Sequence, residues 1–154
     1  MRLTMHTDYA LRLLMLLAME PDELHTIDEV ARRYRISRNH LMKVAQTLAQ
    51  AGFIDSQRGR GGGVRLRGTA AALNLGAVVR QTEDSLALVE CFDRERNSCV
   101  VAPACGLRGA LGEALQAFLS VLDRYSLADL IGSPTSLRQM RRLLQDPRVQ
   151  EVRP

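Results

Sequence analysis

Apolar residues recur at helical spacing along most of the chain. The spacing predicts a first helix over 8–19, with Thr7 as its N-cap. Thr26 and Glu29 form a capping box that predicts a second helix, and Ser37 precedes a third over 38–50. Two short helices joined by a tight turn form a helix-turn-helix.

A β-hairpin is predicted directly after the third helix. Short strands over 53–56 and 64–66 flank a tip over 57–63 that contains four glycines and two arginines. The glycines leave room for phosphates to approach the backbone closely. A nucleotide-binding P-loop is excluded, because no Gly-Lys-Ser/Thr follows. The fold class predicted is mainly α with a small β-wing, a winged helix-turn-helix.

The second half of the chain predicts further helices. They cover 75–82, 107–125 and 136–145, with a strand or extended link over 86–89, an irregular stretch over 91–105 and a capped turn over 126–131. The helix over 107–125 has a broad apolar stripe, interpreted as a subunit interface, with packing inside one chain as the alternative. The segments expected are a DNA-binding domain (1–83), a cysteine-containing loop (84–106), a dimerisation helix (107–131) and a C-terminal helix and tail (132–154).

Positive charge is concentrated in one part of the chain. The 154 residues carry a net charge of +4, but nine basic residues and one acid in 32–67 give that block +8, while 69–154 is neutral. Such a block is typical of a polyanion-binding surface, and a solvated Arg-rich face is the alternative. The candidate DNA contacts are Arg38, Asn39, His40 and Lys43 on the third helix and Arg58, Arg60 and Arg65 on the hairpin. No apolar run is long enough to cross a membrane and no signal pattern follows the N-terminus, so a cytoplasmic location is expected.

All three cysteines lie within fifteen residues of one another, in a polar stretch. Cys91, Cys99 and Cys105 cannot all pair as disulfides, and soft ligands at short spacing suit an iron–sulfur cluster or a zinc ion. A reactive-thiol sensor is the alternative. His6, His25 and His40 show no metal-ligand spacing, and His25 is expected in a loop. No catalytic motif is present, so an enzyme is not expected.

Several motifs together resemble one family. They are the first ten residues, 37–41, Ala51-Gly52-Phe53, 58–63, the three cysteines and the helix from Leu107. Over about residues 1–131 the chain is similar to the winged-helix iron–sulfur transcriptional regulators that include NsrR and IscR. The segment 103–108 most resembles the nitric-oxide-sensing branch, because Arg108 stands where the other branch tends to carry a histidine ligand.

The resemblance implies a homodimeric repressor that binds a palindromic promoter in double-stranded DNA and senses nitric oxide through an iron–sulfur cluster. The ligands implied are Cys91, Cys99, Cys105 and Asp8 of the partner subunit. A [4Fe-4S] cluster is preferred and [2Fe-2S] is possible, because the seven-residue spacer between Cys91 and Cys99 is longer than the family's usual four or five. Two alternatives stay open: a redox or iron sensor of the same fold using a two-iron cluster or bare thiols, and an interaction protein that docks an enzyme.

Overall fold

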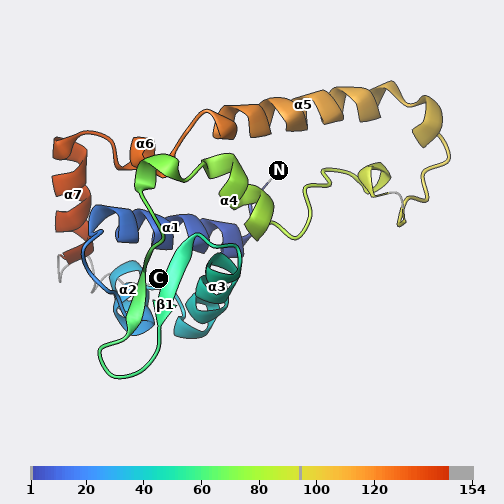
Figure 1. Ribbon diagram of the computed structural model, residues 1–154. Helices are drawn as coiled ribbons and strands as arrows, with labels where there is room; N and C mark the ends of the chain where they lie inside the picture. The colour runs from blue at the N-terminus through green and yellow to red at the C-terminus, as the bar shows by residue number, and fades with distance from the viewer. Residues whose placement is uncertain (1, 94, 146–154) are drawn as a thin grey trace.

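The computed structural model describes residues 2–93 and 95–145 (Figure 1). Helices dominate, and the described residues hold one two-stranded antiparallel sheet. The helices and strands are α1 (Met5–Met19), α2 (Ile27–Tyr34), α3 (Arg38–Gln50), β1 (Ile54–Gln57), β2 (Gly63–Leu66), α4 (Leu75–Thr82), α5 (Gly106–Asp123), α6 (Leu127–Ile131) and α7 (Pro134–Gln145), with 3-10 turns η1 (Ala70–Ala72), η2 (Glu90–Phe92) and η3 (Ala102–Ala104). The mainly α fold with a small β-wing is as predicted.

Helix α1 begins earlier than predicted. Its N-cap is Thr4, whose hydroxyl accepts a hydrogen bond from the Thr7 backbone, and Thr7 itself is buried inside the first turn. A Glu83 carboxylate oxygen accepts from both the backbone N–H and the hydroxyl of Thr4, at 2.8 and 3.0 Å. This contact across 79 residues fixes the start of α1, and no local pattern reveals it.

The helix-turn-helix forms where the sequence predicts it. Thr26 caps α2 through the Glu29 backbone, although the Glu29 side chain lies against Arg33 instead of completing the capping box. Arg35 ends α2 with a φ of 54°, and α3 follows after Ser37.

The wing, defined here as residues 54–66, follows α3 closely. In the antiparallel register Ile54 lies opposite Leu66 and Gln57 opposite Gly63. His25 lies beside β2 as an isolated antiparallel β-bridge, because its backbone pairs with that of Val64. Gly63 permits this approach, since a Cβ there would lie 2.7 Å from the His25 carbonyl oxygen.

The second half of the chain departs from the prediction at three places. Residues 86–89 form no strand; residues 86–88 line a pocket with Leu115 and Phe118 of α5 instead of pairing with another strand. Helix α5 ends at Asp123, two residues early. Helix α7 begins at Pro134, two residues before the predicted start at 136, as the fixed φ of proline allows at a first helical position.

Helix α1 is the centre of the core. Leu13, Leu14 and Leu16 are fully buried, and α1 contacts α3, α4 and α6. Helix α5 packs on α4 and extends away from the helix-turn-helix, so the cysteine loop, residues 91–105, lies at the end of the molecule beyond it (Figure 1). No described helix has the length and apolarity needed to span a membrane.

Candidate nucleic-acid interface and cysteine loop

The predicted DNA-contacting side chains of α3 are all on the surface. Arg38, Asn39, His40 and Lys43 are exposed, while Leu41 and Val44 of the same helix are buried in the core. The helix is therefore held by its apolar face and presents its polar face outward, the arrangement that a recognition helix needs.

Arg38 already has a carboxylate partner. Its Nε donates to Asp28 Oδ1 at 2.6 Å, and its Nη1 lies 3.3 Å from Met42 Sδ. Both charged side chains are more than half exposed, so the pair is open to solvent and to ligands. Contact with a base edge would require Arg38 to leave Asp28, a competition that the sequence does not show.

The wing presents its arginines at and near the tip. Arg58, Arg60 and Arg65 are exposed, and Gly59 and Gly61 turn the tip with φ values of 99° and 78°. Arg67 differs, because it pairs with Asp55 across the wing at 2.7 Å.

A groove runs between α3 and the wing, and sequence reasoning did not assign it. It is lined by Met42, Gln46 and Gln50 of α3 and by Ser56 and Arg58 of the wing. Gln46 and Arg58 are both exposed and both line it, so an amide and a guanidinium share this groove. The helical spacing of 42, 46 and 50 is the signal that could have placed them on one side of α3.

Asp8 lies in the first turn of α1 and faces Arg12. The pair is bidentate, with distances of 3.1 Å from Arg12 Nε to Asp8 Oδ1 and 2.7 Å from Arg12 Nη2 to Asp8 Oδ2. The Arg12 guanidinium also lies over the Tyr9 ring, whose centroid is 6.4 Å from that of His40. Asp8 is thus connected through side-chain contacts to the exposed face of α3.

The cysteine loop is built mostly from turns. Cys91 lies in η2, Cys99 is exposed, and Cys105 stands at the N-terminus of α5; all three thiols are free. Asn97 accepts a hydrogen bond from the Cys99 backbone. Hydrogen bonds from Ser98, first from its side chain and then from its backbone N–H, lower the pKa of Glu90. Within the described residues the three sulfur atoms do not meet at one point.

The donor chemistry of this loop fits an iron–sulfur cluster. Three thiols stand on one segment, none is buried in the hydrophobic core, and Cys91 and Cys105 are only partly covered. Soft sulfur ligands are what iron in such clusters requires. The chain supplies three of them, so a fourth ligand has to come from another residue type or another chain.

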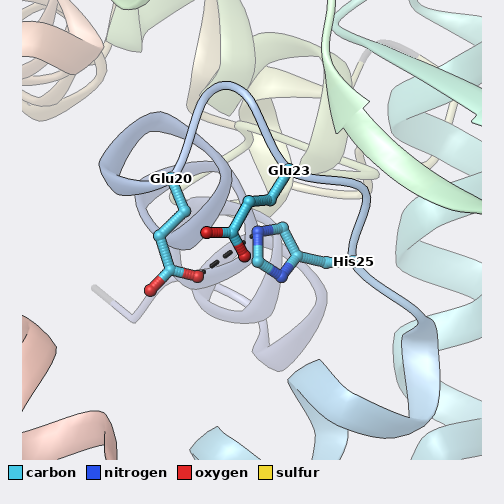
Figure 2. Close-up of side chains that lie close together, drawn as sticks. All are labelled: Glu20, Glu23 and His25. Carbon is cyan, nitrogen blue, oxygen red and sulfur yellow. Dashed lines mark ion pairs between the residues drawn. The ribbon is translucent and has the colours of Figure 1, made fainter.

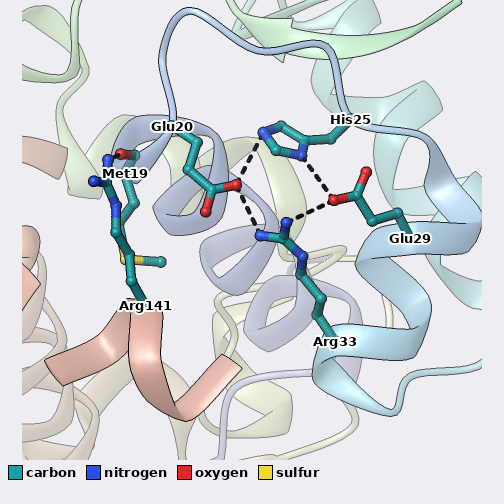
Figure 3. Close-up of polar contacts among 6 residues, drawn as sticks. All are labelled: Met19, Glu20, His25, Glu29, Arg33 and Arg141. Carbon is teal, nitrogen blue, oxygen red and sulfur yellow. Dashed lines mark hydrogen bonds and ion pairs between the residues drawn. The ribbon is translucent and has the colours of Figure 1, made fainter. Parts of the chain in front are cut away.

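His25 is the residue that the sequence interpretation missed. It lies in the predicted loop, but its side chain is 1% exposed and sits between the carboxylates of Glu20 and Glu29 (Figure 3). Arg33 bridges the same two carboxylates at 2.7 Å each. One arginine of the basic block is therefore neutralised in a half-buried network. The available signal was the four-residue spacing of His25, Glu29 and Arg33.

The sequence profile of the Rrf2 family, described as "Iron-dependent Transcriptional regulator", matches residues 3–133. The chain belongs to the Rrf2 family. Its Rrf2 relatives include the HTH-type transcriptional regulator NsrR of Bacillus subtilis (strain 168), 50% identical over 91% of this chain and 97% of that protein. NsrR of Halalkalibacterium halodurans is 49% identical over 93% of this chain and 99% of that protein. This Rrf2 protein is accordingly a DNA-binding transcriptional regulator and not an enzyme.

Solved structures agree with the Rrf2 assignment. CymR of B. subtilis, described as its global cysteine regulator, is 25% identical with a TM-score of 0.67, covering 84% of this chain and 95% of that one. IscR of T. potens has a TM-score of 0.68 over 85% and 86% of the two chains, and its 20% identity supports the fold alone.

Proposed function

We propose that the protein is a transcriptional repressor that senses nitric oxide through an iron–sulfur cluster. The observation that supports this most is the identity of about one half, over nearly the whole chain, to regulators named NsrR. The three free cysteines on one exposed loop provide the matching donor set. A DNA-binding regulator acts where the chromosome lies, which supports a cytoplasmic location.

The cluster would be held by Cys91, Cys99 and Cys105, with Asp8 of the partner subunit as fourth ligand. A [4Fe-4S] form is preferred and [2Fe-2S] is the other form considered. When bound, such a cluster supplies iron that reacts with nitric oxide. Arg12 holds the Asp8 carboxylate of its own chain in a fixed orientation through two contacts. A carboxylate is a hard ligand among soft ones, so Asp8 is the ligand that we expect to be displaced first.

DNA binding would use a homodimer on a palindromic site. Arg38, Asn39, His40 and Lys43 would enter the major groove, and Arg58, Arg60 and Arg65 would hold the flanking backbone or minor groove. Helix α5 begins at Gly106, directly after Cys105, and packs on α4, which contacts α1 and α3. A change in the loop therefore has a continuous path of packed helices to the recognition helix.

The decisive experiment is anaerobic reconstitution of the full chain with iron and sulfide. We expect bound iron and sulfide, a brown protein, and tight binding to a duplex selected from a random pool, with nitric oxide releasing the DNA. Cys→Ser at 91, 99 or 105 should abolish the colour and the nitric oxide response while far-ultraviolet circular dichroism stays unchanged. Asp8→Ala should keep or weaken the colour and alter the response.

Two outcomes would contradict the proposal. Absence of iron after reconstitution, or one zinc ion in its place, would remove the cluster. A DNA response to peroxide or thiol oxidants in iron-free protein, with none to nitric oxide, would favour a bare-thiol redox regulator of the same fold.

A further inference from the structure

A cluster of possible metal ligands lies between α1 and α2, at the opposite end of α1 from Asp8. Glu20 follows α1, and Glu23 and His25 precede α2. One oxygen from each carboxylate and one ring nitrogen all lie within 4.8 Å of one another (Figure 2). Figure 1 shows this segment well separated from the cysteine loop. The cluster is therefore not part of the cysteine-based site.

The His25 ring is buried without a hydrogen-bond partner. Its side chain is 1% exposed, and neither ring nitrogen makes a hydrogen bond in the described part of the chain. Nε2 lies 3.3 Å from Glu20 Oε2 and Nδ1 lies 3.5 Å from Glu29 Oε1. A neutral imidazole carries one N–H, so one nitrogen lone pair faces a carboxylate oxygen, which is repulsive. A cation between lone pair and carboxylate removes that repulsion.

The surrounding residues suit the support of a metal ligand. Glu29 faces Nδ1, and a proton on that nitrogen leaves the Nε2 lone pair directed at Glu20 and Glu23 (Figures 2 and 3). A carboxylate behind a ligating histidine is the common way to fix its tautomer. Arg33 holds Glu20 and Glu29 at 2.7 Å each, which orients the ligating carboxylate.

The charge of the cluster matches a divalent ion. Three glutamates and Arg33, with His25 neutral, sum to −2. His25 is buried and Glu20 has only 9% of its side chain exposed, whereas Glu23 is exposed and opens the cluster to solvent. A nitrogen ligand with two carboxylates favours a borderline ion of the zinc class over Ca²⁺ or Mg²⁺, which take oxygen ligands.

We propose that Glu20, Glu23 and His25 bind a zinc-class divalent cation at the base of the wing. The His25 backbone donates to the Val64 carbonyl at 3.0 Å and accepts from the Val64 N–H at 2.8 Å. A bound ion would thus hold the α1–α2 segment against β2. The function assigned to the site is to fix the wing, independently of any cluster on the cysteine loop.

The test uses the full chain with Cys91, Cys99 and Cys105 changed to serine, because thiolates compete for zinc. Zn²⁺ alone is titrated by calorimetry, and the imidazole nitrogens of the three histidines are followed by NMR. We expect one ion per chain, a shift of His25 Nε2, and slower exchange of the Val64 amide. Glu23→Gln should weaken binding at least tenfold without unfolding, since Glu23 is exposed. Asp22→Asn, the adjacent exposed carboxylate, is the matched control and should bind as the parent does.

Three results would overturn the site. The first is equal zinc affinity of the Glu23→Gln and Asp22→Asn variants. Zinc could shift His6 and His40, which share a pocket beside α3, instead of His25. Zinc could fail to bind at millimolar concentration while both His25 nitrogens carry protons, which would make the cluster an ion-pair network around an imidazolium.

Discussion

At the scale of single residues, the proposed DNA contact of Arg38 would compete with the Arg38–Asp28 ion pair. The Arg38–Asp28 contact is short, at 2.6 Å, but both side chains are exposed. Exposed pairs contribute about 0.2–1 kcal/mol. Asp28→Asn should therefore raise affinity for the selected duplex about 1.4- to 5-fold. Arg38→Ala should lower it by about 1–3 kcal/mol if Arg38 reads a base with two hydrogen bonds.

Fluorescence anisotropy over a range of salt concentrations checks both changes. Asp22→Asn is the control, since it removes an exposed carboxylate outside this pair. If Asp22→Asn and Asp28→Asn raised affinity equally, the gain would come from net charge and not from release of Arg38.

Tyr34 gives the molecule a sensitivity to high pH. Burial, the largest effect, raises the pKa of its hydroxyl to about 12, while the charges of Arg12 and Arg33 lower it. The unfolded hydroxyl titrates near 10, so between pH 10 and 12 the folded chain binds more protons. The contribution of the Tyr34 hydroxyl to the free energy of unfolding is therefore complete below pH 10. It should fall by about 1.4 kcal/mol per pH unit up to pH 12. Urea unfolding of Tyr34→Phe should lack this slope; an equal slope in both proteins would assign it to other groups.

At the scale of elements, the apolar residues of α5 are partly buried within the chain and partly exposed. Leu115 and Leu119 are buried within the chain, as the packing alternative expects, whereas Leu107 is 65% and Val121 42% exposed. Substituting Leu115 would therefore damage the fold rather than test an interface. Leu107→Asp should give monomers in sedimentation, because a charge in an apolar dimer contact is costly. Gln116→Asp, nine residues further along and on the opposite face of α5, should stay dimeric; a dimer in both would place the interface elsewhere.

Elements with a local signal were predictable, and those set by distant contacts were not. Helix α4 and its Asn74 cap follow from residues a few positions apart. The start of α1 depends on Glu83, and residues 86–88 line a pocket with α5 instead of pairing with a strand. The candidate DNA residues were predictable as exposed positions of an amphipathic helix and a glycine-rich turn. The burial of His25 was not, because it arises from Glu20 and Val64, which the fold brings together.

At the scale of the whole molecule, the two ends are connected through one core. The cysteine loop leads into α5, α5 packs on α4, and α4 contacts both α1 and α3. Under the proposed function, the iron-loaded form binds the selected duplex more tightly than the iron-free form. A coupling of 1–3 kcal/mol, typical of linked sites, corresponds to a factor of about 5–150.

Thermodynamic linkage then requires the reverse effect, in which DNA favours retention of iron by the same factor. The full chain, loaded anaerobically, should need a correspondingly higher concentration of an iron chelator for half removal when the selected duplex is present. The comparison is made at equilibrium, because linkage governs affinities and not rates. A scrambled duplex of equal length and charge is the control, and it should raise the half-removal point much less. Equal retention on both duplexes would show that DNA protects the loop by proximity alone, without any conformational coupling between the cysteine loop and α3.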